Sequence, residues 1–226
     1  MNMRKWFGLM LVLMLAFVLA ACGGDSDDDN DSDGDSSSAS SADLSQSITA
    51  EDPNFGGSLT VNYPEGWVAT DSGGVISLAE SQATLDLAQN ATDTAPALEE
   101  NTVFVSITPL APELVSIFIE EGQTATPAIL LDATILAGGT DTLDVQPVEI
   151  TDINGKSGAT VSAVSTNADE PGRLFAVAVA VDNGYVIVTA ITNPDETDFD
   201  DTVRAIAGAV EATFPVAEEA TEEPAG

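Results

Sequence analysis

The sequence predicts an α+β fold in which a mostly antiparallel sheet of six or seven strands is covered by two or three helices. Three observations support this fold class. Short runs rich in Val, Ile, Thr and Phe recur between turn sequences, as strands do. The later runs are joined in pairs by turns that contain Asn-Gly, which is typical of β-hairpins. A segment near the C-terminus instead carries apolar residues at helical spacing.

The first predicted strands lie in residues 58–107. Residues 58–63 alternate apolar and polar side chains, and the turn Pro64-Glu65-Gly66-Trp67 follows them. Further strands are predicted at residues 67–69, at residues 75–78 and at residues 102–107, where β-branched and aromatic residues dominate. The first predicted helix comes after these strands.

Two helices are predicted in the middle of the chain. Pro112 begins the first and Gly122 ends it, because proline suits the first turn of a helix and glycine suits its end. Thr126-Pro127 begins the second, which Gly138-Gly139 closes. The residues of this second helix that are expected to face the core are Leu130, Leu131, Thr134 and Ile135.

The last third of the domain is predicted to contain two hairpins and a helix. A strand at residues 145–150 turns at Asn154-Gly155 and returns at residues 159–164. Residues 174–181 and 185–190 form the second hairpin, and both strands are apolar on both faces, which places them centrally in the sheet. Residues 198–212 are predicted to be an amphipathic helix. Its expected buried stripe is Val203, Ile206, Ala207, Val210 and Phe214.

The first 22 residues resemble the signal of a bacterial lipoprotein. Arg4 and Lys5 are basic, residues 7–18 are almost wholly apolar, and the small residues before Cys22 suit a peptidase. Residues 1–21 are therefore predicted to be a signal peptide, and Cys22 is expected to carry lipid that holds the chain on the extracytoplasmic face of a membrane. The alternative is an uncleaved membrane helix, for which the apolar run is slightly short.

Composition divides the rest of the chain into three parts. Residues 22–52 are predicted to be the lipidated cysteine and a disordered acidic linker, because Gly, Ser, Asp and Ala offer little apolar surface to bury. The globular domain is predicted at residues 53–215. Residues 216–226 are predicted to be an acidic, disordered tail.

One stretch of the linker imitates a calcium-binding loop. Asp29, Asp31, Asp33 and Gly34 occupy the first positions of such a loop, but Ser40 stands where a bidentate Glu is required. No metal site is therefore predicted, and no cofactor is expected.

The charge balance restricts the partners of the chain. The sequence holds 38 acidic against 5 basic residues, and its formal net charge is −33. After Lys5 its bases are Lys156, Arg173 and Arg204. A negative field of this size disfavours nucleic acid and bare anionic lipid. The expected partners are the membrane, reached through lipid on Cys22, and an envelope or membrane protein.

Two stretches of the domain resemble the PsbP-like superfamily. The entry motif is a strand followed by Tyr63-Pro64-Glu65-Gly66-Trp67. The exit motif is the hairpin at residues 173–193, then Asp198-Phe199 and a helix that closes on Phe214. This resemblance covers residues 55–215 and implies an antiparallel sheet between helices. The superfamily includes photosystem-associated subunits and bacterial lipoproteins of unknown role, so the resemblance implies a fold and no single function.

The side chains needed for most enzymatic mechanisms are missing. The sequence has no histidine, so it has no Ser-His-Asp triad and no imidazole metal site. The single cysteine is the expected lipid attachment site. Lys156-Ser157 offers a Ser-Lys pair in an expected exposed turn, and scattered carboxylates leave open acid/base hydrolysis. The chain is predicted not to be an enzyme.

Three side chains are candidate binding residues. Tyr63 and Trp67 could line a pocket, although pinning the first strand to the core is the favoured interpretation. Arg173 is a rare cation that could bind an anion or pair with a neighbouring carboxylate such as Asp169, Glu170 or Asp200. The function predicted is a lipid-anchored interaction or assembly module. The alternatives are a carrier of a small apolar ligand or cation, and a carboxylate-dependent hydrolase.

Overall fold

The computed structural model describes residues 43–51, 57–89, 98, 101–119, 122–138, 142–167 and 171–215. The strands are β1 (Gln46–Glu51), β2 (Ser58–Tyr63), β3 (Val68–Ser72), β4 (Val75–Ala79), β5 (Phe104–Leu110), β6 (Leu143–Val145), β7 (Glu149–Ile153), β8 (Lys156–Ser165), β9 (Arg173–Val181), β10 (Gly184–Thr192) and β11 (Glu211–Thr213). The helices are α2 (Gln82–Gln89), α3 (Pro112–Phe118), α4 (Pro127–Gly138) and α5 (Asp200–Ala209). The predicted α+β class is confirmed.

The strands form two antiparallel sheets. The larger sheet has eight strands in the order β3-β4-β5-β10-β9-β8-β6, with β7 also paired to β8, and the smaller has the order β1-β2-β11. β9 and β10 lie centrally, as their two apolar faces predict. The described strands outnumber the six or seven predicted, because β1 and β11 were not predicted and one predicted strand is divided into two, β6 and β7.

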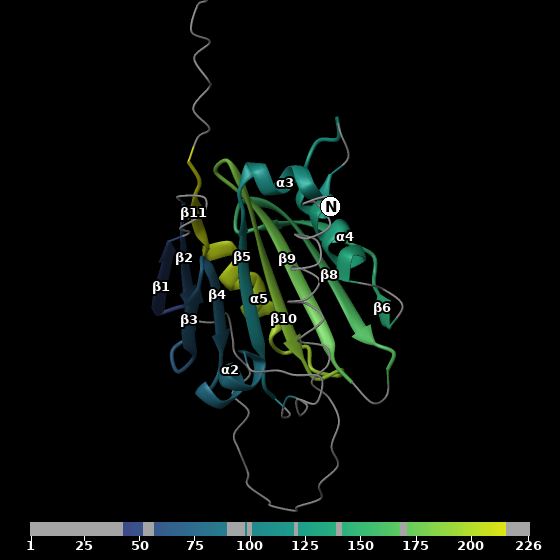
Figure 1. The fold of residues 1–226 in the computed structure, drawn as a ribbon. Helices are drawn as coiled ribbons and strands as arrows, with labels where there is room; N and C mark the ends of the chain where they lie inside the picture. The colour runs from purple at the N-terminus through teal and green to yellow at the C-terminus, as the bar shows by residue number, and fades with distance from the viewer. Residues whose placement is uncertain are drawn as a thin grey trace, which may run out of the picture.

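Three layers result (Figure 1). Alternate residues of β9 point to opposite faces of the large sheet. Phe175, Val177 and Val179 belong to one core together with α5 and the small sheet. Leu174, Ala176 and Ala178 belong to a second core with α3 and α4. Figure 1 shows α3 and α4 in front of the large sheet and α5 behind it. We call these outer layers the α4 layer and the α5 layer.

Strand β1 corrects the predicted linker. It lies within residues 22–52, where composition predicted disorder, yet it pairs with β2 from Gln46↔Tyr63 to Glu51↔Ser58. Ala50 is buried and Ile48 packs against the same core. Ile48 and Ala50 alternate with polar residues, so one face of the segment can pack against the core. β2 supplies the hydrogen-bond partners of its backbone N–H and C=O groups. The ordered body therefore begins before the predicted boundary at residue 53.

The predicted strand at residues 145–150 is divided into β6 and β7, which pair with successive parts of β8. Pro147 lies between them, and proline has no N–H to give to a strand ladder. The Asn-Gly turn that follows β7 is confirmed. Asn154 and Gly155 have φ values of 55° and 81°, the left-handed conformation that a two-residue hairpin turn requires.

The helix predictions are confirmed in existence and corrected in length. α3 ends at Phe118 and not near Gly122, since Ile119 is already extended. The helix predicted at residues 198–212 is α5, and it ends at Ala209. Residues 211–213 form β11, because β2 has a free edge there and offers backbone partners. Phe214 therefore lies beyond the helix. Helix α2 was not predicted.

Candidate functional site

Helix α4 is held firmly on the large sheet. The Thr126 hydroxyl accepts a hydrogen bond from the Ile129 N–H at 3.3 Å, and Pro127 begins the helix. The segment before the helix is fixed by Tyr185 of β10, whose hydroxyl donates to the Ala125 carbonyl at 2.8 Å. The core-facing residues predicted for this helix are confirmed: Leu130, Leu131, Thr134 and Ile135 are all buried.

The outer side of α4 is also apolar. The helix carries one charge, Asp132, in twelve residues. Ile129, Ala133 and Leu136 follow each other at helical spacing on the side away from the buried stripe, and we call them the α4 stripe. Ile129 and Ala133 are half-buried, and 61% of Leu136 is exposed. A helix that is apolar on all sides is normally covered on all sides.

A second exposed apolar side chain lies in the same layer. Ile150 of β7 is 82% exposed and stands opposite Ala159 of β8. Cross-strand partners point to the same face, and Ala159 belongs to the core beneath α4. Leu136 and Ile150 are the large apolar side chains that stand out as exposed among the described residues. Both therefore belong to the α4 layer.

The bases of the described residues lie in the other layer. The Arg173 guanidinium forms a bidentate ion pair with Asp200 at the start of α5, with both N–O distances at 2.7 Å. The same group donates to the Glu196 carbonyl at 3.1 Å. Arg173 is 7% exposed, so this pair is largely withdrawn from water. The predicted pairing of Arg173 with Asp200 is confirmed. Because Arg173 lies in β9 and Asp200 in α5, we expect this ion pair to act as a clamp that holds the helix on the sheet.

Arg204 joins Arg173 around one aromatic ring. Its guanidinium carbon lies 4.8 Å from the centre of the Phe175 ring, and that of Arg173 lies 5.6 Å from it. Arg204 also pairs with Asp201 at 3.0 Å, although 83% of the Asp201 side chain is exposed. Two cations therefore gather on the α5 side of the sheet.

Lys156 completes this arrangement at the other end of α5. Its ammonium donates to the Val210 carbonyl, just past the helix, and Asn154 of the same turn donates to the Gly208 carbonyl at 3.4 Å. Donors and positive charge suit a helix C-terminus. Burial lowers the pKa of Lys156 below its ordinary value of 10.5, and Glu211 partly opposes this shift. The turn was expected to be exposed, and its lysine is instead half-buried.

The lowered pKa of Lys156 predicts a pH dependence of stability. Between the folded pKa and 10.5, the unfolded chain binds more protons at this site than the folded chain, so the free energy of unfolding rises with pH across this window. Below the window the cost of burying the ammonium is fully present. Replacing Lys156 with Met should remove this rise, which urea unfolding at several pH values would measure. Lys156→Arg, which stays charged, should also lack it; curves parallel to wild type in both variants would contradict the assignment.

The Lys156-Ser157 pair is not arranged for catalysis. The two residues are neighbours in β8, and successive side chains of a strand point to opposite faces. Lys156 is directed to α5, and Ser157 is exposed. Within the described residues, no group of three or more metal-ligating side chains is close enough to hold a metal ion.

The other predicted binding residues pack in the α5 layer. Trp67 follows the turn in which Gly66 has a φ of 85°, and its ring meets that of Phe199 edge to face at 6.3 Å. Trp67 contacts Phe199, and Arg173 pairs with the next residue, Asp200. The structure therefore brings Trp67 and Arg173 to neighbouring residues at the start of α5. Tyr63 lies at the end of β2, half-buried against the same core. This packing agrees with the favoured structural interpretation of Tyr63 and Trp67.

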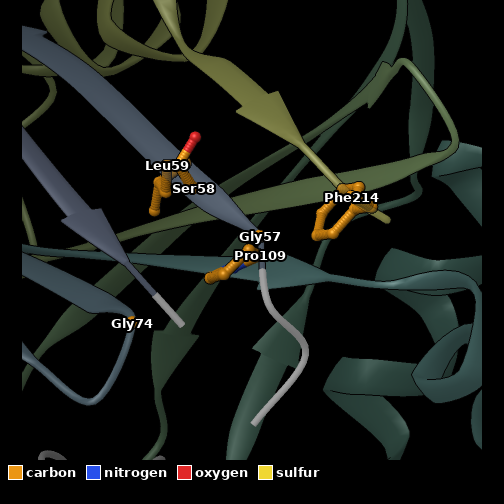
Figure 2. Close-up of a pocket in the computed structure, with 6 residues that line it drawn as sticks. All are labelled: Gly57, Ser58, Leu59, Gly74, Pro109 and Phe214. Atoms are coloured by element: carbon orange, nitrogen blue, oxygen red, sulfur yellow. The ribbon is translucent and has the colours of Figure 1, made fainter. Parts of the chain in front are cut away.

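One small hollow lies at the junction of the two sheets (Figure 2). It is lined by Gly57, Ser58, Leu59, Gly74, Pro109 and Phe214. The space open to a water-sized sphere is about 10 Å³, which is room for about one water molecule. Small-ligand sites usually measure roughly 300–1,000 Å³. This hollow therefore has no room for the apolar ligand of the carrier hypothesis.

Several predictions fall outside the described residues. These are the signal peptide, lipid attachment at Cys22, the calcium-like stretch and the acidic tail. Among the helices that the structure describes, none is long and apolar enough to cross a membrane.

Sequence reasoning missed the α4 stripe and Ile150. The signal was present, because residues 127–138 contain a single charge and an apolar residue on every side of the helix. The helical pattern identifies the core-facing residues correctly, and the apolar residues that it leaves on the outer side are the signal for this surface.

Comparison with known proteins finds solved structures to which the chain is similar. No family model and no curated protein matches this sequence. The chain is similar to the solution structure of cyanobacterial PsbP (CyanoP) from Synechocystis sp. PCC 6803, with 14% identity, a TM-score of 0.42 and coverage of 81% of this chain and 98% of that one. LpqN of Mycobacterium tuberculosis, described as involved in cell envelope biogenesis, shows 12% identity, a TM-score of 0.43 and coverage of 75% and 91%.

A third similar structure comes from Bacteroides thetaiotaomicron VPI-5482, with 9% identity and a TM-score of 0.37. The match covers 76% of this chain and 49% of that one. At these identities no function is carried from any of the three, and the α4 layer is judged on its own residues.

Proposed function

We propose that this chain is a lipid-anchored, extracytoplasmic interaction module that docks an envelope or membrane protein on its α4 layer. The observation that carries the proposal is the position of Leu136 and Ile150. Both are large, apolar and mostly exposed, and both lie on the same side of the large sheet. An interface with an apolar centre would remove them from water.

The rigidity of α4 supports a docking role. The helix is capped by Thr126, and its inner residues Leu130 and Leu131 are wholly buried. Tyr185 holds the preceding segment in place. A surface fixed in this way loses little conformational entropy when a partner binds, which favours affinity.

The position of the first and last described strands also supports it. β1 and β11 flank β2 in the small sheet, which packs in the α5 layer. The first and last strands that the structure describes, β1 and β11, therefore lie on the side of the large sheet opposite α4.

The proposed activity is binding and not catalysis. The sequence has no histidine, and Lys156 and Ser157 point apart. The small hollow between the sheets holds about one water molecule. These features favour a surface that recognises another protein over catalysis by Lys156 and Ser157 or a ligand in this hollow.

The test is photo-crosslinking in intact cells that produce the full chain. A photoreactive residue at Ile150 is expected to capture one protein in a fixed ratio, and the same residue at Ala205 on the outer side of α5 is expected to capture none. Leu136→Gln should lower the yield at Ile150 by about tenfold or more, as loss of an interface anchor does. Equal capture at both positions, or an unchanged yield in Leu136→Gln, would refute docking on the α4 layer.

A further inference from the structure

We infer that the occupant of the α4 layer is a protein surface with an apolar centre and a rim of lysine or arginine. This inference rests on the proposed docking function and specifies its partner. It is carried by the distribution of the bases, which among the described residues are all engaged in the α5 layer.

All bases of the described residues are engaged in the α5 layer. Lys156 donates to the Val210 carbonyl, Arg173 pairs with Asp200, and Arg204 lies over Phe175 beside Asp201. The α4 layer therefore offers no positive charge among the residues that the structure describes. A partner with an acidic rim would meet no compensating group there.

Acidic side chains do border the apolar surface. Asp132 is exposed and directly precedes Ala133 of the α4 stripe. Glu113 is exposed in the first turn of α3, which packs beside α4. At the far side, Asp152 of β7 is exposed and follows Ile150 by two residues, so it points to the same face. Complementary charge at the rim of an interface sets the choice of partner and the rate of association.

The same charges argue against two other occupants. A second copy of this chain would bring a formal charge of −33 against −33, so like charges would oppose self-association. Anionic lipid would be repelled in the same way. In addition, the first and last described strands, β1 and β11, pack in the α5 layer and not in the α4 layer.

The test uses purified full-length protein in a nonionic detergent and two synthetic helical peptides as probes. Both peptides carry the same leucine stripe, flanked by lysine in one and by glutamate in the other. With a photoreactive residue at Leu136, the lysine peptide is expected to crosslink about tenfold more than the glutamate peptide. Its yield should fall about tenfold in Asp132→Lys/Glu113→Lys and in 0.5 M NaCl.

The control for general attraction is the photoreactive residue at Ala205. An acidic protein attracts any cationic peptide, so equal yields at Leu136 and Ala205 would overturn the inference. Equal yields for the two peptides at Leu136 would also overturn it, while leaving docking by an uncharged apolar surface intact. In a second sample, with the protein reconstituted in phosphatidylcholine vesicles and the detergent removed, crosslinking of Leu136 to lipid in preference to the lysine peptide would identify a bilayer as the occupant and overturn the inference as well.

Discussion

Replacing Arg173 with alanine is expected to lower the free energy of unfolding by about 3 kcal/mol. The substitution leaves Asp200 at the start of α5 without its bidentate partner, in a place where only 18% of the Asp200 side chain reaches water. It also removes a hydrogen-bond donor from the Glu196 carbonyl and a guanidinium group from the Phe175 ring. Urea unfolding followed by Trp67 fluorescence would measure the change, since Trp67 packs on the neighbouring Phe199.

The matched control is Arg204→Ala. Arg204 contacts the same Phe175 ring and also pairs with an aspartate of α5, but its side chain is 39% exposed and its partner Asp201 is 83% exposed. Exposed pairs contribute roughly 0–1 kcal/mol, so a small loss is expected. If Arg173→Ala and Arg204→Ala cost the same, the Arg173–Asp200 pair is not the clamp described above.

Replacing Leu131 with alanine is expected to lower the free energy of unfolding by about 2–5 kcal/mol. Leu131 is fully buried between α4 and the sheet, so the shorter side chain leaves a cavity. Leu136→Ala is the same substitution five residues later in the same helix, at a position that is 61% exposed. Its expected cost is within about 0.5 kcal/mol.

This pair of variants separates folding from docking. Thermal unfolding by circular dichroism should place Leu136→Ala close to wild type and Leu131→Ala far below it. In the crosslinking experiment, Leu136→Ala should weaken capture at Ile150 although its stability is unchanged. A large loss of stability in Leu136→Ala would mean that the side chain supports the fold and is not available to a partner.

The central part of the fold was predictable because local signals and burial agree there. Residues 174–181 and 185–190 are apolar on both faces, and only the middle of a covered sheet accommodates such strands. The Asn154-Gly155 turn was predictable for a similar reason, since few residue pairs adopt its backbone conformation.

The edges of the fold were not predictable from local pattern. β1 has only Ala50 buried, and β11 has only Ala212 buried, so neither segment carries the continuous apolar signal of a strand. Both become strands because β2 offers a free backbone edge on each side. Tertiary pairing of this kind depends on neighbours that are distant in sequence.

The candidate site was predictable in part. Arg173 is one of few bases among many acids, so an ion pair was predictable, and Asp200 was one of the three carboxylates proposed as its partner. The structure contains this pair. The side of the sheet on which each cation lies depends on strand register, which fixes Lys156 opposite Ile153 and Ala159 opposite Ile150. Without that register, the separation of bases from exposed apolar residues could not be seen.

The antiparallel pairing of β1 with β2 determines how the body responds to tension. The chain enters β1 at Gln46, which is opposite Tyr63 and lies at the open end of the hairpin, far from the connection between Glu51 and Ser58. A pull transmitted through the chain before Gln46 loads the hydrogen bonds one after another, starting at that end, instead of shearing them together. β1 would separate from β2 and add about 20 Å of extended chain before the folded body, at roughly 3.3 Å per residue. β2 would remain held by β11, so the large sheet would stay intact.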